Sequence, residues 1–165
     1  KVRLIAGQLD ALKAPAPPPD SWAADPDNGV VIALIQLESG DSLRLPGASE
    51  GTHRRLYLFE GESVQLNGSA FNPGTGAKID ASPTLLEGGD GPSRLLWLQG
   101  KPIAEPVAKY GPFVMNTQQE IQQAMEEFRL TRFGGWPWRH PDPVHVRERG
   151  RFAKFPDGRE VDKSE

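Results

Sequence analysis

Histidines are the first residues to consider, because imidazole serves both as a general base and as a metal ligand. The chain has three of them, His53, His140 and His145. His140 and His145 lie in a proline-rich segment with Asp142 between them. A metal site needs three or four ligands that converge on rigid elements, and this segment offers only two histidines and one carboxylate. We therefore expect no metal site there.

His53 is an even weaker candidate for a metal ligand. Arg54 and Arg55 follow it directly. Two neighbouring cations repel a metal ion. We therefore do not expect this imidazole to bind a metal.

A glycine-rich segment resembles a phosphate-binding loop: Gly74-Thr75-Gly76-Ala77-Lys78. A P-loop needs glycine directly before lysine, a hydroxyl residue directly after it, and a helix beyond. Here Ala77 separates glycine from lysine, and Ile79 stands where the hydroxyl belongs. The segment therefore predicts a turn between two strands.

Thiolate nucleophiles are excluded, because the chain has no cysteine. Carboxylates are plentiful, but sequence alone cannot pair two of them for acid–base work. We predict no catalytic, cofactor-binding or metal-binding residue in this chain.

Short strands and turns make up most of the chain. The 18 glycines and 16 prolines together amount to about a fifth of the 165 residues, which is too many for a helix bundle. Apolar runs recur at 2–6, 29–40, 42–45, 55–61, 62–68, 84–86 and 94–98. Leu56 and Leu58 alternate with Tyr57 and Phe59, the period of a half-buried strand. This spacing predicts an antiparallel sandwich or barrel. The proline-rich segment 11–29 is expected to be a surface loop that Trp22 attaches to the body.

One amphipathic helix follows the strands. Thr117 and Glu120 fit a capping box. An apolar stripe then recurs at helical spacing, formed by Ile121, Ala124, Met125 and Phe128. We expect a helix over about 117–131, a domain over 1–134, and an extended C-terminal tail over 135–165.

Charge and hydropathy exclude two classes of partner. With 19 basic and 22 acidic residues the net charge is −3, so the chain is not a general binder of nucleic acid. No apolar run is long enough to span a membrane. The absence of cysteine suits a reducing cytoplasm, which is where we expect the protein. Because Lys1 leads straight into a strand-like run, we expect the chain to be a piece of a longer protein.

Two segments carry a family resemblance. LYLFEGESVQLNG (56–68) resembles the strand–turn–strand element of cupin barrels. GKPIAEPVAKYGPFVMNTQQEIQQAMEEFRLTRFG (100–134) resembles the C-terminal domain of the pirin family. The resemblance implies a mostly β, jelly-roll cupin barrel or sandwich, the second barrel of a bicupin. In that family three histidines and one glutamate of the first barrel hold the metal, usually iron(II).

The same resemblance locates the cupin metal positions in this chain. Counting back from Gly61, the position of the glutamate ligand falls on Arg54, and the histidine positions fall near Glu50 and Ala48. No histidine in 54–139 supplies the later ligand. A lone imidazole at His53 does not hold iron(II). We therefore expect no metal in this barrel.

Several functions remain open at this point. The chain is expected to be a metal-free, non-catalytic barrel that scaffolds or caps a metal-binding N-terminal barrel, its main partner. The whole protein is alternatively an iron-dependent quercetin 2,3-dioxygenase with its active site in that first barrel, or a redox-responsive regulator in which this domain binds a protein partner. A barrel that binds a small molecule alone is a further alternative, with Tyr57, Phe59 and Trp97 lining its interior.

Overall fold

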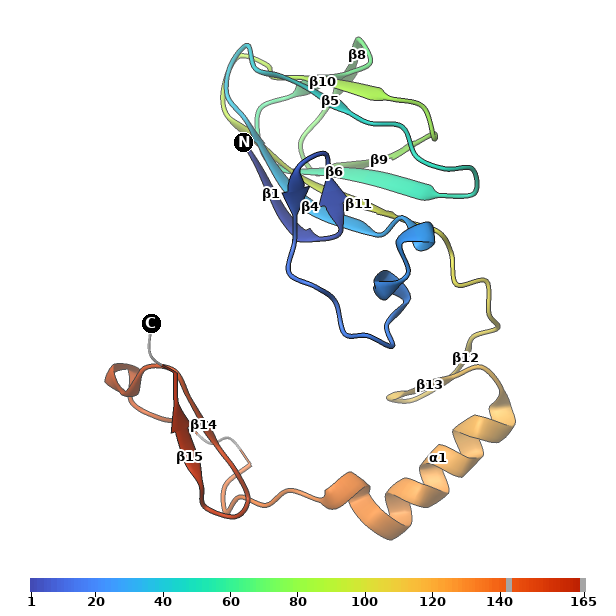
Figure 1. The fold of residues 1–165 in the computed structure, drawn as a ribbon, viewed down its shortest axis with the longest axis vertical. Helices are drawn as coiled ribbons and strands as arrows, with labels where there is room; N and C mark the ends of the chain where they lie inside the picture. The colour runs from blue at the N-terminus through green and yellow to red at the C-terminus, as the bar shows by residue number, and fades with distance from the viewer. Residues whose placement is uncertain (142–143, 164–165) are drawn as a thin grey trace. The chain divides into compact units, whose positions relative to one another are not determined.

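The computed structural model describes residues 1–141 and 144–163. The chain forms two compact units, Lys1–Ala104 and Glu105–Glu165, each described here by itself (Figure 1). A compact unit is not the same as an independently folding domain. The division at residues 134 and 135 therefore stays a prediction.

The first unit is a sandwich of two antiparallel sheets, drawn one above the other in Figure 1. The five-stranded sheet has the order β1-β4-β11-β6-β9. Its strands are β1 (Val2–Ala6), β4 (Val31–Leu37), β11 (Ser93–Gly100), β6 (His53–Gly61) and β9 (Thr75–Ile79). The four-stranded sheet has the order β5-β10-β7-β8. Its strands are β5 (Ser42–Leu45), β10 (Thr84–Glu87), β7 (Val64–Leu66) and β8 (Ser69–Phe71). The predicted antiparallel sandwich is confirmed, in the form of two separate sheets.

Alternation along the strands builds the core between the sheets. In β6 the side chains of Leu56 and Leu58 are fully buried, while Tyr57 and Phe59 are exposed. The buried positions of the other strands meet them from both sheets, among them Ala33, Ile35, Leu45, Leu86, Leu95 and Trp97. Because side chains alternate with a period of two, this register turns one face of each central strand, such as β4 and β6, into the core.

A glycine turn ends β6. Gly61 has φ = +97°, and a Cβ atom there would lie 2.0 Å from the carbonyl oxygen of Pro92. Only glycine permits this close approach of two backbones. The register shift between Arg94 and Leu95 lies beside it. The turn is the Gly-Glu element on which the resemblance to cupins partly depends.

The proline-rich loop is held by hydrogen bonds rather than by a sheet. It begins with β3 (Leu12–Lys13), which pairs with the preceding strand β2 (Gln8–Leu9), and continues through two 3-10 turns, η1 (Trp22–Ala24) and η2 (Pro26–Asn28). The indole Nε1 of Trp22 donates to the carbonyl oxygen of Lys101 at 3.0 Å. The side chain of Asn28 donates to the carbonyl oxygen of Trp22 at 2.8 Å. Trp22 therefore attaches the loop to the body, as predicted.

The second unit begins with a hairpin and a helix. The hairpin pairs β12 (Ala108–Tyr110) with β13 (Phe113–Met115), and α1 spans Gln118–Thr131. Thr117 caps α1, and both halves of the capping box with Glu120 are present, so the predicted helix is confirmed. Within the stripe, Ile121 is buried, and Phe128 packs edge-on against Phe113 and Phe133.

Short elements complete the second unit. They are the 3-10 turns η3 (Arg132–Gly134) and η4 (Arg147–Arg149), and a hairpin of β14 (Phe152–Lys154) with β15 (Glu160–Asp162). The predicted extended tail thus contains a small hairpin of its own. Among the residues that the structure describes, no helix combines the length and the apolar character needed to cross a membrane.

Candidate functional site

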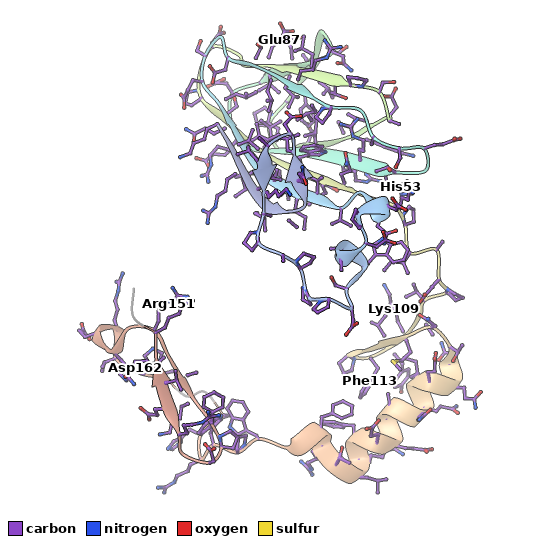
Figure 2. The ribbon with its side chains drawn as sticks, viewed as in Figure 1. His53, Glu87, Lys109, Phe113, Arg151 and Asp162 are labelled. Atoms are coloured by element: carbon purple, nitrogen blue, oxygen red, sulfur yellow. The ribbon has the colours of Figure 1, made fainter. Side chains whose placement is uncertain are left out.

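The histidines are not gathered into a site. His53 opens β6 with its side chain on the exposed side of the strand, at the end of the sandwich labelled in Figure 2. His145 packs edge-on against the ring of Phe152, with ring centroids 4.8 Å apart, and the carbonyl oxygen of His140 accepts the indole N–H of Trp136 at 2.7 Å. Asp142 lies outside the described residues. Over 1–141 and 144–163, no group of three or more His, Cys, Asp or Glu side chains converges as metal ligands would.

The glycine-rich segment is a turn only at Gly74, because residues 75–78 already belong to strand β9 (Thr75–Ile79), so the predicted turn is shorter than expected. Gly74 has φ = +74°, and its N–H donates to the carbonyl oxygen of Leu58 at 2.7 Å. The chain then enters β9 directly. A phosphate loop would lead into a helix, whose N-terminus attracts the anion. A strand follows here instead.

The interior of the sandwich contains one charged side chain, Arg54, and it is fully buried. Its Nη1 donates to the carbonyl oxygens of Asp80, at 2.9 Å, and Ser82, at 2.7 Å. Its Nη2 donates to the carbonyl oxygen of Pro46 at 2.8 Å. The guanidinium carbon also lies 5.7 Å from the ring centroid of Trp97, a cation–π contact. Three backbone carbonyls and one aromatic ring thus hold the cation inside the core.

Burial determines the electrostatics of this site. It lowers the pKa of the Arg54 guanidinium, and the charge of Asp80 opposes that shift. An arginine stays protonated at neutral pH, so the interior carries a positive charge. A divalent cation in the same interior would be repelled, and the groups around Arg54 are neutral carbonyls. The surroundings of Arg54, where the cupin resemblance implies a metal ligand, therefore do not fit iron(II).

The opposite side of the five-stranded sheet presents an apolar surface, here called the outer face. Strand register places Leu34, Leu96 and Tyr57 side by side in one row, and Ile32 and Leu98 in the next. These side chains are half-buried or, for Tyr57, on the border of exposed. Cations surround them: Arg3, Arg55, Lys78 and Arg94. Apolar residues on both sides of β4 predict such a surface, and the structure confirms it.

This surface also corrects one sequence-based hypothesis. Tyr57 and Phe59 were candidates to line the interior together with Trp97. Trp97 does lie inside, with only 1% of its surface exposed, but Tyr57 is 36% and Phe59 47% exposed. Both follow buried leucines in β6, so the alternation of the strand turns them outward. Phe59 instead lies under the guanidinium of Arg94, which also pairs with Glu60 at 2.7 Å.

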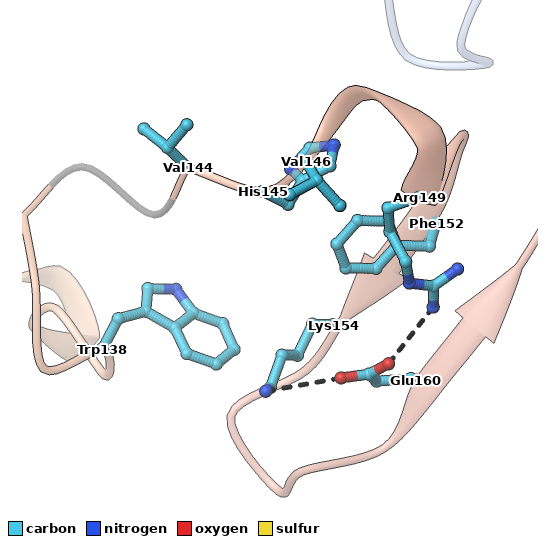
Figure 3. Close-up of a pocket in the computed structure, with 8 residues that line it drawn as sticks. All are labelled: Trp138, Val144, His145, Val146, Arg149, Phe152, Lys154 and Glu160. Carbon is cyan, nitrogen blue, oxygen red and sulfur yellow. Dashed lines mark hydrogen bonds and ion pairs between the residues drawn. The ribbon is translucent and has the colours of Figure 1, made fainter.

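A third candidate is a hollow of about 510 Å³ beside the β14–β15 hairpin, shown in Figure 3. Its walls are mostly apolar and its charges are paired: Trp138, Val144, His145, Val146, Arg149, Phe152, Lys154 and Glu160. Hydrogen bonds from Arg149, and then from Lys154, lower the pKa of the Glu160 carboxyl group. The Arg149 guanidinium lies 4.1 Å from the ring centroid of Phe152. Because two cations hold its carboxylate, Glu160 is not free to act as a general base in this hollow.

Sequence reasoning missed the parts of the Arg54 site that come from distant segments. Arg54 itself was singled out by counting back from Gly61. Its acceptors are backbone carbonyls of Pro46, Asp80 and Ser82, and no side-chain pattern marks them. Only one feature of the sequence itself marks the site: Arg54 lies at an inward position of a strand in which buried and exposed residues alternate.

The chain is similar in sequence to known proteins. The family model "Pirin C-terminal cupin domain" matches residues 32–134. A Pseudomonas aeruginosa protein named "Putative quercetin 2,3-dioxygenase" is 52% identical over 134 residues, covering 81% of this chain and 43% of that protein. "Pirin-like protein 2" of Arabidopsis thaliana is 35% identical over 147 residues, covering 81% of this chain and 42% of that one.

A solved structure is also similar. The crystal structure of quercetin 2,3-dioxygenase from Acinetobacter baumannii superposes with a TM-score of 0.65 at 26% identity, covering 81% of this chain and 44% of that chain. The chain spans less than half the length of these relatives. What it matches is therefore one part of each longer protein.

Proposed function

This chain belongs to the pirin family through its C-terminal cupin domain, and on that premise we propose that it is a metal-free, non-catalytic barrel. Its role is to scaffold or cap a metal-binding first barrel supplied by another part of a longer protein. One observation carries the proposal: the guanidinium of Arg54, the residue that the cupin resemblance places at the glutamate position, is buried in the core and donates to backbone carbonyls.

The charge of Arg54 is what supports a structural role for this interior. A cupin metal site gathers imidazoles and a carboxylate around a divalent cation, whereas this interior supplies a cation and neutral carbonyl acceptors. Those acceptors belong to loops that follow β5 and β9. Arg54 therefore ties the two sheets' connecting loops together and stabilises the sandwich itself.

The outer face supports the docking role. A sheet face that is exposed to water usually carries polar side chains. Here, however, a row of apolar side chains crosses β4, β11 and β6. The cations around it favour a partner surface with an apolar centre and acidic side chains at its edge. The N-terminal barrel of the same protein is the partner that we propose.

The whole protein is proposed to act as a flavonol-opening dioxygenase. Relatives named as quercetin 2,3-dioxygenases support this proposal. Iron(II) in the first barrel would supply the oxygen chemistry. The present chain would contribute no group to that reaction, and would cover one side of the barrel that performs it.

Anaerobic loading with iron(II) tests the metal-free assignment. The chain is desalted and its iron is measured by mass spectrometry, and quercetin and oxygen consumption are followed in parallel. We expect no saturable binding and no turnover, with the same background in the His53→Ala variant. Stoichiometric iron retained by the chain would overturn the proposal.

Intact-mass analysis of the natural material tests the docking role. Under native conditions, we expect a histidine-rich barrel to be present, either on the same polypeptide or on a co-purifying one. Recovery of this chain free of any such barrel would contradict the scaffold assignment.

A further inference from the structure

Two asparagine–glycine pairs occur in the chain, Asn28-Gly29 and Asn67-Gly68. Asparagine is one of the less heat-stable residues of proteins, because its side-chain amide can be lost. A following glycine favours this loss, since glycine has no side chain to restrict the movement of its backbone nitrogen toward the asparagine. The two pairs have the same sequence but different surroundings, so the structure decides which of them can react.

Asn67-Gly68 forms the two-residue turn of the β7–β8 hairpin. Leu66 and Ser69 are strand partners on either side of it. Asn67 has φ = +49° and Gly68 has φ = +78°, as in a type I′ turn. Both residues are exposed, and a Cβ atom on Gly68 would meet no other atom within 4 Å. Because β8 is the last strand of its sheet, the turn lies at a sheet edge that opens easily.

The hydrogen bonds of this turn leave its reactive groups free. The backbone N–H of Asn67 donates to the carbonyl oxygen of Leu85 at 2.9 Å, and the Oδ1 of Asn67 accepts the N–H of Leu85 at 2.8 Å. Within residues 1–141 and 144–163, neither the N–H of Gly68 nor the Nδ2 of Asn67 has a hydrogen-bond partner. Leu85 therefore holds Asn67 in place, while the peptide group of Gly68 is free to rotate toward it.

Asn28-Gly29 has the opposite surroundings. Asn28 is only 8% exposed, and its Nδ2 donates to the carbonyl oxygen of Trp22 at 2.8 Å. The N–H of Gly29 donates to the carbonyl oxygen of Pro26 at 3.0 Å. Both groups that would have to react are thus already bonded. Reaction at this pair requires the surrounding loop to open first.

We propose that Asn67 is a site of spontaneous deamidation in the folded protein and that Asn28 is protected from it. The backbone nitrogen of Gly68 loses its proton to hydroxide and bonds to Cγ of Asn67. The Cγ–Nδ2 bond breaks, Nδ2 takes up a proton from water and leaves as ammonia, and a five-membered imide remains. Water then opens this ring at either of its two carbonyls, which yields aspartate or isoaspartate. Nothing is oxidised or reduced.

The two products differ in their effect on the hairpin. Aspartate keeps the backbone unchanged and retains an oxygen that can accept the N–H of Leu85. Isoaspartate leads the backbone through the side chain and adds one carbon to the turn, so the pairing of Leu66 with Ser69 is lost. Val64 and Phe71 pair further along the same hairpin and are buried in the core. We therefore expect isoaspartate, and not aspartate, to destabilise the sandwich.

Incubation of the folded chain at mildly alkaline pH tests the proposal, and it requires neither a metal nor the first barrel. Peptide mapping by mass spectrometry follows the amide of each asparagine, and isoaspartyl-specific enzymatic methylation detects the rearranged product. We expect Asn67 to lose its amide at least about tenfold faster than Asn28, since the buried pair reacts only after local opening. In concentrated urea, which removes the surroundings of both pairs, the two rates should become similar.

Variants identify the nucleophile and the damaging product. Gly68→Asp keeps a residue that tolerates positive φ but places a side chain beside the attacking nitrogen, so the loss of the Asn67 amide should slow. Asn67→Asp is the matched control for the product, and it should unfold at the same urea concentration as the original chain. Protein enriched in isoaspartate by long incubation should unfold at a lower concentration.

Two outcomes would overturn the proposal. One is a similar rate of amide loss at Asn28 and Asn67 in the folded chain. The other is a folded chain in which Asn67 keeps its amide although it loses it in urea. An unchanged rate in Gly68→Asp would contradict the assignment of the nucleophile. If that variant does not fold, the comparison of the folded chain with the chain in urea decides alone.

Discussion

The two faces of the five-stranded sheet are built from the same strands and differ in what completes them. The inner face is closed by the four-stranded sheet, and its one cation, Arg54, donates to three carbonyls. The outer face keeps an apolar centre around Leu96, with its cations exposed at the edge. We therefore expect the inner face to determine stability, and we propose the outer face as the surface for binding. Exchanging adjacent residues of one strand tests this difference, because their side chains alternate.

The largest effect is expected from Arg54→Ala. This change leaves three backbone carbonyls without their donor and opens a cavity beside Trp97, so we expect a loss of about 3–5 kcal/mol of unfolding free energy. Urea denaturation followed by circular dichroism measures it. Arg55→Ala, one residue along and exposed, is the control and should stay within about 0.5 kcal/mol. Equal losses of unfolding free energy in the two variants would contradict the assignment of Arg54 to the inner face and Arg55 to the outer face.

Removing a leucine side chain from the core should lower the unfolding free energy somewhat less than Arg54→Ala does. Leu58→Ala deletes a fully buried side chain, and we expect a loss of about 3 kcal/mol by the same denaturation experiment. Phe59→Ala removes a larger side chain from the next position, but that ring is 47% exposed. Its loss should cost about 1 kcal/mol. A greater loss for Phe59→Ala than for Leu58→Ala would contradict the assignment of inside and outside.

The binding character of the outer face is tested by making it polar. The double change Tyr57→Thr and Leu96→Thr keeps residues that favour strands, so we expect a change in unfolding free energy of about 1 kcal/mol. The fluorescence of a dye that binds exposed apolar surface should fall. The same dye with Thr117→Ala, a change in the separate helix cap, serves as the reference. Unchanged dye binding in the double variant would show that the apolar row is not an accessible surface.

The smallest effect is expected at the edge of the outer face. Glu60→Gln removes the ion pair with Arg94, in which both side chains are at least half exposed. Exposed pairs contribute little, so the unfolding free energy should change by less than about 0.5 kcal/mol. Repeating the measurement at high salt should abolish even this difference. A loss comparable to that of Arg54→Ala would place this pair among the structural contacts.

Local patterns along the chain were sufficient for much of the fold. The alternation in β6 predicts that Leu56 and Leu58 lie inside, and they are fully buried. Thr117 and Glu120 mark the start of α1, because a capping box depends only on residues within one turn. The turn at Gly74 could likewise be predicted, because a turn depends only on its own few residues. Such features need no knowledge of which strands become neighbours.

The candidate site is different, because its partners are far apart in sequence. Arg54 reaches carbonyls 8, 26 and 28 residues away. Gln99 comes beside it only because β11 pairs with β6. That order is set by packing of the whole sandwich and by loop lengths, which strand periodicity does not encode.

The sequence by itself determined which residues could carry chemistry and which side of each strand is apolar, because residue type and period are local properties. Only the tertiary structure decided that Arg54 is buried with three backbone carbonyls as its acceptors, and that Trp97 and Gln99 face the same interior. The physical reason is that a buried charge is tolerated only where distant backbone groups converge to solvate it.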